Sequence, residues 1–223
     1  MAKPILYVGN KNYSSWSMRP WLALTWAGIA FEERVIALGG PGYGKSKIGE
    51  VLRVSPSGRV PALHVGDLVI YDSLAICEWA AEQAPSLWPA DAGTRARARS
   101  ASAEMHSGFA ALRRDLSMNV KRRMQTAPTF PEDTHADLAR LYELWGELRG
   151  RYAKEGPYLL GARSIADAMY APVATRLRTY AVAAPEVAKA YCETIFADEG
   201  FRAWERGAEA ESWTIASADE LYR

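Results

Sequence analysis

The sequence predicts an α/β N-terminal domain with a mixed four-stranded sheet, followed by an all-α C-terminal domain. Strand-like apolar runs alternate with helical patterns over residues 1–84, which is typical of βαβ units. Pro85 and Pro89 then interrupt the pattern, and we take 85–93 as the linker between the domains. Residues 94–223 carry apolar side chains at helical spacing, so we expect the second domain to be helical throughout.

The composition is that of an ordinary globular protein with a sizeable core. Of its 223 residues, 49% are hydrophobic and 24% are charged, and the net charge is +1. This balance gives no reason to expect a nucleic-acid or membrane partner, and no apolar run approaches the ~20 residues that span a bilayer. The only cysteines are Cys77 and Cys192, which excludes a disulfide framework and favours a reducing, cytoplasmic location.

A serine-rich stretch joins the first predicted strand to the first predicted helix. The strand is Ile5–Val8, and the helical pattern covers 20–27, with Pro20 in its first turn. Ser14 and Ser15 lie between the two. Serine is a preferred helix N-cap, but a helix N-terminus also favours a bound anion such as a thiolate, carboxylate or phosphate. Capping is the simpler interpretation, and both stay open at this point.

Three further strand-like runs complete the predicted sheet. Residues 31–38 form a second strand, which a right-handed crossover would place parallel to the first. Ala62–Val65 and Leu68–Tyr71 are joined by Gly66 and Asp67 alone. A two-residue connection makes a hairpin, so these two strands must be antiparallel.

Two candidate binding features flank this hairpin. Val60 and Pro61 precede it, and a cis bond between them would expose the Val60 backbone to a pocket. After it, Asp72 and Ser73 open the next helix, either as a cap or as a second anion site. Cys77 lies on the apolar side of that helix and is expected to be a core residue rather than a nucleophile.

Residues 39–46 match the phosphate-binding pattern G-x-x-x-x-G-K-[ST] letter for letter. A nucleotide-binding fold of that kind needs several parallel strands, and no strand-like run follows Asp72. The antiparallel hairpin would also give the strand that ends in Asp72, the candidate magnesium ligand, the wrong direction. We therefore expect a connecting loop here, with nucleotide binding as the weaker alternative.

The second half of the chain divides into several helices. Apolar residues recur at helical spacing through Ala101–Leu116 and Leu138–Tyr152. Ser164–Asp167 fits a capping box that opens an apolar helix. Residues 198–211 form the last helix, after which the tail is expected to pack Trp213 against the body. No group of His, Cys and acidic residues has metal-ligand spacing, so no metal is expected.

Four motifs, in this order and spacing, resemble the cytosolic glutathione transferase superfamily over nearly the whole chain. They are Tyr-Ser-Ser-Trp-Ser-Met-Arg-Pro-Trp at 13–21, Val-Pro-Ala-Leu at 60–63, Asp-Ser-Leu-Ala-Ile at 72–76 and Ser-Ile-Ala-Asp at 164–167. The first motif is similar to the serine-type classes, zeta in particular, and it lacks the cysteine of the cysteine-type classes. The resemblance implies a thioredoxin-like N-terminal domain, a cytoplasmic homodimer and a role in detoxification.

The resemblance also implies roles for individual residues, with glutathione as co-substrate. Ser14 would donate a hydrogen bond to the glutathione thiolate, with Ser15 as the alternative, and the helix N-terminus would lower the thiol pKa from its usual ~8.5. The implied glutathione-binding residues are Trp16, Lys45, Val60, Pro61, Asp72 and Ser73. The implied electrophile pocket, between the domains, holds Met105, Phe109 and Arg113.

The leading functional prediction is a glutathione transferase that conjugates glutathione to small apolar electrophiles. One alternative is a glutathione-dependent cis–trans isomerase of the maleylacetoacetate kind, which would use an arginine in the helix after the capping box. Arg176 and Arg178 lie near that position, although neither matches it without a shift. Arg163, before the capping box, also departs from the apolar residue usual in the family. The other alternative is a non-catalytic binding module that keeps the transferase fold.

Overall fold

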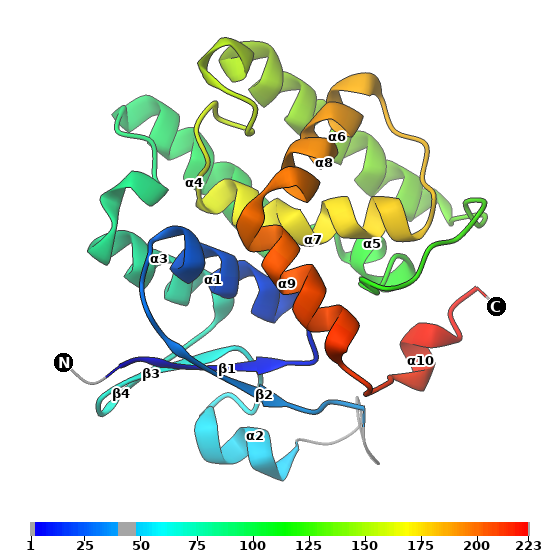
Figure 1. Cartoon of the computed structure of the whole chain (residues 1–223). Helices are drawn as coiled ribbons and strands as arrows, with labels where there is room; N and C mark the ends of the chain where they lie inside the picture. The colour runs from blue at the N-terminus through cyan, green and yellow to red at the C-terminus, as the bar shows by residue number, and fades with distance from the viewer. Residues whose placement is uncertain (1–2, 40–47, 223) are drawn as a thin grey trace.

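The computed structural model of the chain describes residues 3–39 and 48–222 (Figure 1). A small sheet with its flanking helices occupies one side, and a larger group of helices occupies the other. The elements of the first half are β1 (Ile5–Gly9), α1 (Ser15–Trp26), β2 (Glu32–Ile36), α2 (Gly49–Val54), β3 (Ala62–Val65), β4 (Leu68–Tyr71) and α3 (Ser73–Gln83). Those of the second half are η1 (Pro85–Leu87), α4 (Ala92–Ser107), α5 (Ala110–Asp115), α6 (Glu132–Tyr152), η2 (Ala153–Glu155), α7 (Ile165–Thr179), α8 (Glu186–Ala197), α9 (Glu199–Ala210) and α10 (Ala216–Asp219).

The sheet is mixed and four-stranded, as predicted, with the strand order β2-β1-β3-β4. Strands β1 and β2 are parallel, whereas β1 pairs with β3 and β3 with β4 in antiparallel register. The hairpin is therefore confirmed. Strand β4 is antiparallel to β3, whereas a nucleotide-binding fold would need it to be parallel. The phosphate-loop match itself lies, apart from Gly39, outside the described residues.

Helices α1 and α3 cover the face of the sheet that is turned toward the helical half, and α2 lies on the opposite face (Figure 1). Leu6, Val8 and Leu63 are fully buried beneath α1 and α3. Helix α1 also packs against α7, so one apolar core continues from the sheet into the helical half. The expected linker at 85–93 holds η1 and the first two residues of α4, while the division into domains stays a prediction.

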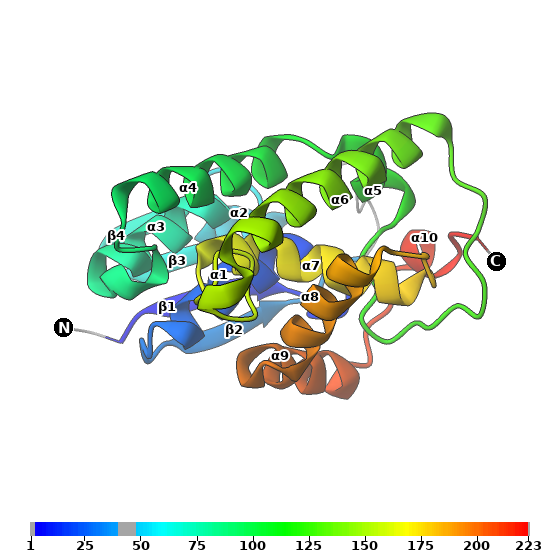
Figure 2. The ribbon, with the colours of Figure 1, turned by 90° about the horizontal axis from the view of Figure 1, so that it is seen from above.

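Helix α7 is the centre of the helical half. In Figure 2, α4 and α6 lie along one side of it, and α8 and α9 along the other. The capping box at its start is confirmed, because Asp167 Oδ2 accepts from Ser164 N at 2.8 Å while the Ser164 side chain caps the N3 backbone. Small residues such as Ala168 and Ala171 let its neighbours approach closely, and both are fully buried.

Two predicted helix boundaries were wrong. Helix α1 begins at Ser15 rather than Pro20, because Ser14 is the N-cap and its Oγ accepts from Ser17 N at 3.3 Å. Pro20 therefore stands inside the helix. The helix expected over residues 101–116 is broken after Ser107, where Phe109 takes a left-handed φ of 54° between α4 and α5.

The apolar period runs across this break because the side chains on both sides of it still face the core. Phe109 and Leu112 are both buried. A side chain of α6 caps the start of α5, since Asp137 Oδ2 accepts a hydrogen bond from Leu112 N at 2.9 Å.

The tail does not pack as expected either. Trp213 is 43% exposed, whereas Ile215 is buried and takes the place of Trp213 as the apolar anchor. Ile215 lies where a side chain at Gly39 would stand, since a Cβ there would come within 2.9 Å of it. Across residues 3–39 and 48–222, no helix is both long and apolar enough to cross a bilayer.

Candidate functional site

A cavity of about 400 Å³ opens where the start of α1, the start of β3 and the start of α3 meet α4. Its walls come from three of the sequence motifs and from one residue of the helical half. The lining residues are Trp16, Ser57, Arg59, Val60, Pro61, Tyr71, Asp72, Ser73 and His106. The fold thus brings Trp16, Val60–Pro61 and Asp72–Ser73 together, as the sequence predicted.

Ser14 lies at the N-cap of α1 and takes part in a chain of hydroxyl groups. Its Oγ donates to Ser17 Oγ at 2.8 Å, and Ser17 Oγ also accepts from Gly9 N at 3.0 Å. Ser14 is 8% exposed. Because a serine hydroxyl can rotate, Ser14 is able to redirect its proton from Ser17 to a sulfur placed at the helix N-terminus.

Ser15, at the first position of α1, is held from the helical half. Its Oγ accepts a hydrogen bond from Arg176 Nη2 at 3.0 Å, and the residue is buried. The arginine occupies only the acceptor side of this hydroxyl, so the Ser15 proton is also free to be donated. Both serines are therefore able to donate a hydrogen bond to a thiolate, as was expected of one of them. Neither serine lines the 400 Å³ cavity itself.

The Val60–Pro61 peptide is cis, as predicted from the sequence. Ala62, the next residue, is the first of β3 and pairs with both β1 and β4. Val60 stands just outside this ladder, and within the described chain its backbone has no hydrogen-bond partner. An extended ligand that lies beside Val60 therefore meets an open backbone edge.

Asp72 and Ser73 form the second helix start of the cavity. Asp72 caps α3, with Oδ1 accepting from Leu74 N at 2.8 Å and from Ala75 N at 3.3 Å. It does so at a φ of 90°, a conformation that few non-glycine residues adopt. The Ser73 hydroxyl is buried and has no partner among the described residues. A buried hydroxyl without a partner is unusual and points to a group that arrives with a ligand.

His106 is the functional residue that the sequence did not reveal. It extends from α4 across to the other half, with Nε2 3.1 Å from Asp72 Oδ2 and its ring edge-on to Trp16 at 5.4 Å between centroids. Its Nδ1 is buried and unpartnered within the described chain. The sequence showed only an isolated histidine, because nothing local signals that α4 passes over the start of α3.

Three arginine side chains surround Trp16 and Ser15. The Arg19 guanidinium lies 4.3 Å from the Trp16 ring centroid and that of Arg113 lies at 5.5 Å, while Arg176 reaches Ser15. Burial, with Arg176 and Arg113 nearby, lowers the pKa of Arg19, and burial also lowers the pKa of Arg176 and Arg113. Excess positive charge therefore concentrates beside the start of α1.

Two of these arginines donate hydrogen bonds to carbonyl groups at helix ends, and the third has no such acceptor among the described residues. Arg113 donates to the Met105 carbonyl at the end of α4, at 3.1 Å, and Arg176 donates to the Leu116 carbonyl at the end of α5. Arg19 is fully buried, and its Nε and Nη1 have no partner among residues 3–39 and 48–222. A buried guanidinium without an acceptor is costly unless an anion joins it.

The electrophile pocket expected from the sequence is only partly assembled. Met105 and Phe109 are buried in the core, at 1% and 5% exposure, and neither lines the 400 Å³ cavity. Arg113 is the member of this set that reaches Trp16. Lys45, expected at the glutathione glycyl carboxylate, lies outside the described residues.

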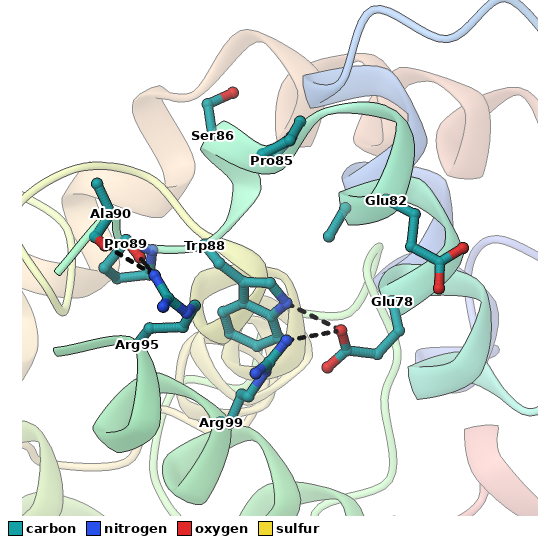
Figure 3. Close-up of a pocket in the computed structure, with 10 residues that line it drawn as sticks. Glu78, Glu82, Pro85, Ser86, Trp88, Pro89, Ala90, Arg95 and Arg99 are labelled. Carbon is teal, nitrogen blue, oxygen red and sulfur yellow. Dashed lines mark hydrogen bonds and ion pairs between the residues drawn. The ribbon is translucent and has the colours of Figure 1, made fainter. Parts of the chain in front are cut away.

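A second hollow, of about 450 Å³, lies between α3 and α4, away from the serines. Figure 3 shows Trp88 at its centre, with its indole N–H directed at Glu78 (3.0 Å) and Arg99 beside the same carboxylate at 3.6 Å. Its tryptophan and arginine side chains are paired within the hollow, so they give no sign of a missing ligand. Within the part of the chain that the structure describes, no cluster of three or more His, Cys, Asp or Glu residues could hold a metal ion.

Comparison with known proteins agrees with this geometry. Residues 13–83 match the family model of the glutathione S-transferase N-terminal domain. A probable maleylacetoacetate isomerase of Caenorhabditis elegans is 35% identical over 109 residues. That alignment covers 48% of this chain and 48% of the isomerase, so the chain matches about half the length of this relative.

Solved structures extend the similarity to the rest of the chain. A glutathione transferase homolog from Burkholderia gl BGR1, with bound glutathione, is 25% identical, with a TM-score of 0.68 over 94% of this chain and 100% of that one. A theta class glutathione S-transferase from Xanthomonas axonopodis pv. citri, also with glutathione bound, is 24% identical, with a TM-score of 0.66 over 96% of this chain and 100% of that one. The second likeness shows the fold alone. Together, the matches support the predicted two-part architecture.

Proposed function

We propose that this chain, whose residues 13–83 match the family model of the glutathione S-transferase N-terminal domain, is a glutathione transferase. One observation carries the proposal. The open Val60 backbone and the unpartnered Ser73 hydroxyl line one cavity with Asp72 and Trp16, beside the N-terminus of α1. An extended peptide with a carboxylate, an amine and a thiol would supply the missing partner for each group.

The cavity accounts for each part of the glutathione molecule. The γ-glutamyl carboxylate would accept from Ser73 at the start of α3, and its amine would bind the Asp72 carboxylate. The cysteinyl backbone would pair with Val60, which directs the sulfur toward Ser14 and Ser15. His106 would hold Asp72 in place from the other half of the molecule.

The chemistry is addition of a thiolate. Hydrogen bonds from Ser14 or Ser15, the N-terminus of α1 and the nearby arginines would all stabilise the thiolate over the thiol, so the thiol pKa falls and its proton leaves to solvent. The sulfur then forms a bond to an electrophilic carbon. Either a leaving group departs with its electron pair, or the π electrons of a double bond shift to the neighbouring carbon, which takes a proton from solvent. We propose a small electrophile bound against Trp16 and Arg113, with no metal taking part.

A second candidate is the glutathione-dependent cis–trans isomerase of the maleylacetoacetate kind. The relative from Caenorhabditis elegans supports it, and so does the unpaired Arg19 beside Trp16. An electrophile with a carboxylate would supply an anion for this arginine, which an apolar electrophile cannot do. In that reaction, the thiolate adds to the double bond, the carbon–carbon bond rotates, and the thiolate leaves again.

We also propose that the protein acts in the cytoplasm as a homodimer, with a role in detoxification. Cys77 and Cys192 are both free and buried, which suits a reducing compartment. Strand β4 is an edge strand whose Leu68 and Tyr71 are 53% and 46% exposed, and a second copy would cover such an edge. Sedimentation equilibrium would detect the dimer directly.

Glutathione binding and turnover test the proposal. Glutathione at a hundredfold its Kd should stabilise the protein by ~2.7 kcal/mol, measured as a thermal shift. Turnover is then measured on two electrophiles, a neutral aromatic halide and a cis-olefinic dicarboxylate, with and without glutathione. If the protein shows neither glutathione binding nor turnover, the proposal is refuted. Binding without turnover on either electrophile would indicate a binding module.

An Arg19→Leu variant separates the two candidate reactions. In an isomerase it should lower turnover of the dicarboxylate at least tenfold and leave that of the neutral halide nearly unchanged. If both electrophiles respond alike, Arg19 has no role in choosing the substrate. Arg99→Leu, on an exposed side of α4, is the matched control.

A further inference from the structure

The loop between β1 and α1 is held by the C-terminal residues. Glu211 accepts two successive backbone N–H groups with its carboxylate, from Lys11 to Oε1 at 2.8 Å and from Asn12 to Oε2 at 3.2 Å. Asp219, in α10, accepts the Tyr13 hydroxyl at 2.9 and 3.0 Å. Two carboxylates from the end of the chain thus bind three consecutive residues near its start.

The helical half supports the same contacts. Trp204 Nε1, in α9, donates to the Lys11 carbonyl at 3.0 Å. Asn119 Nδ2 donates to Asp219 Oδ1 at 2.8 Å and so orients the carboxylate that faces Tyr13. These contacts of Glu211 and Asp219 with Lys11–Tyr13, called the clamp below, are therefore anchored in the body of the protein rather than in the tail alone.

Backbone hydrogen bonds connect Lys11–Tyr13 with Ser14 in one turn. The Asn10 carbonyl accepts from both Tyr13 N, at 3.0 Å, and Ser14 N, at 2.8 Å, which closes a tight turn. Asn10 is itself fixed to the chain after β2, since its Oδ1 accepts from Leu38 N. A shift of Tyr13 would therefore move the Ser14 backbone with it.

These contacts are buried on the side of Lys11 and Asn12, whereas Tyr13, Glu211 and Asp219 are each half-buried. Lys11 is 7% exposed and Asn12 is 2% exposed. Burial raises the pKa of Glu211 in spite of its two N–H donors, and burial together with Asp219 raises the pKa of Tyr13. Hydrogen bonds to an ionised carboxylate are shorter and stronger than those between neutral groups.

We propose that Glu211 and Asp219 are positioning residues for the thiolate site: through Lys11–Tyr13 they set where the Ser14 hydroxyl stands. The inference rests on the proposed function, because it assumes a sulfur at the start of α1. Misplacing a reacting group by about 1 Å can cost ~100-fold in rate. The tail thereby contributes to the reaction without touching either substrate.

The test is a double-mutant cycle of Tyr13→Phe and Asp219→Ala, read by glutathione turnover at temperatures well below unfolding. Each single variant should lower kcat roughly tenfold, which is less than the ~100-fold expected for a shift of about 1 Å. The KM for glutathione should stay within about twofold. The rising limb of the pH–kcat/KM profile should move to higher pH, because a displaced hydroxyl stabilises the thiolate less. The double variant should be no worse than either single one.

Glu220→Gln is the matched control, since Glu220 is exposed and adjacent to Asp219 but its side chain has no hydrogen bond within the described chain. A merely structural clamp would lower the unfolding temperature and leave kcat and the pH profile unchanged, which would overturn the inference. If Asp219→Ala does not fold, Tyr13→Phe alone decides, because it removes one hydroxyl. If the wild-type protein does not bind glutathione, that result refutes the proposed function rather than the positioning role.

Discussion

Arg176 Nη2 donates to Ser15 Oγ over 3.0 Å, which links the central helix of the helical half to the first residue of α1. The same guanidinium binds the Arg113 and Leu116 carbonyls near the end of α5. One buried side chain thus joins the serine loop, α5 and α7. The relationship has consequences for stability and for the choice between the two serines.

Arg176→Lys should destabilise the protein by about 2 kcal/mol. A lysine ammonium cannot reach the Ser15 hydroxyl and two carbonyls at once, so buried acceptors lose their donor. Urea unfolding measures the loss. Arg178→Lys is the control on the same helix, because Arg178 is partly exposed and binds Glu205, and it should cost less than about 1 kcal/mol. Equal losses would contradict the bridging role.

Ser14→Ala should lower kcat for glutathione conjugation by roughly a hundredfold, the usual scale for the loss of a donor to a developing or stabilised anion. Glutathione affinity should change little, because Val60, Asp72 and Ser73 remain. Ser15→Ala is the paired variant. A larger effect in Ser15→Ala would assign the thiolate to Ser15, while full activity in both would refute the hydroxyl mechanism.

Ser73→Ala should leave the free protein as stable as before, or slightly more stable. The Ser73 hydroxyl is buried without a partner, so its removal relieves an unpaired polar group. Glutathione binding should weaken by about 1 kcal/mol, seen as a higher KM with little change in kcat. Ser102→Ala, where the hydroxyl bonds to the Ala98 carbonyl at 2.8 Å, is the buried control and should not affect KM.

Asp198 should make the protein sensitive to acid. Burial by itself would raise its pKa, but Arg163 at 2.7 Å, with Phe201 N and the Trp26 indole N–H, lowers it below the usual range. Since the folded pKa lies below the unfolded one, the stabilisation is complete above about pH 4 and is lost as pH falls through the folded pKa.

Asp198→Asn should therefore cost about 1.5 kcal/mol at neutral pH, because the Arg163 guanidinium is partly exposed to solvent, and it should flatten the acid limb of the unfolding free energy. Denaturant titrations at several pH values would measure it, with exposed Glu199→Gln as the control. An unchanged acid limb would show that Asp198 does not titrate as described. The contact also explains Arg163, which departs from the family pattern: its guanidinium stacks over Trp26 at 5.0 Å while binding Asp198.

Local chemistry made much of the fold predictable. The two-residue connection at Gly66–Asp67 allowed only a hairpin, and the serine and aspartate spacing at 164–167 allowed a capping box. The two wrong boundaries have different causes: the cap at Ser14 starts α1 before its apolar pattern begins, whereas the apolar pattern hid the break at Phe109. Apolar periodicity indicates which side chains face the core, and it continues through a short break when the core does.

The sequence by itself determined the strand–helix order of the first half, the hairpin, and the capped starts of α3 and α7, because each depends on residues a few positions apart. Only the tertiary structure decided that His106 meets Asp72, that Arg176 reaches Ser15, and that Asp219 holds Tyr13. These pairs lie 34, 161 and 206 residues apart in the sequence. Such contacts depend on how whole helices pack, which no local pattern of residues records.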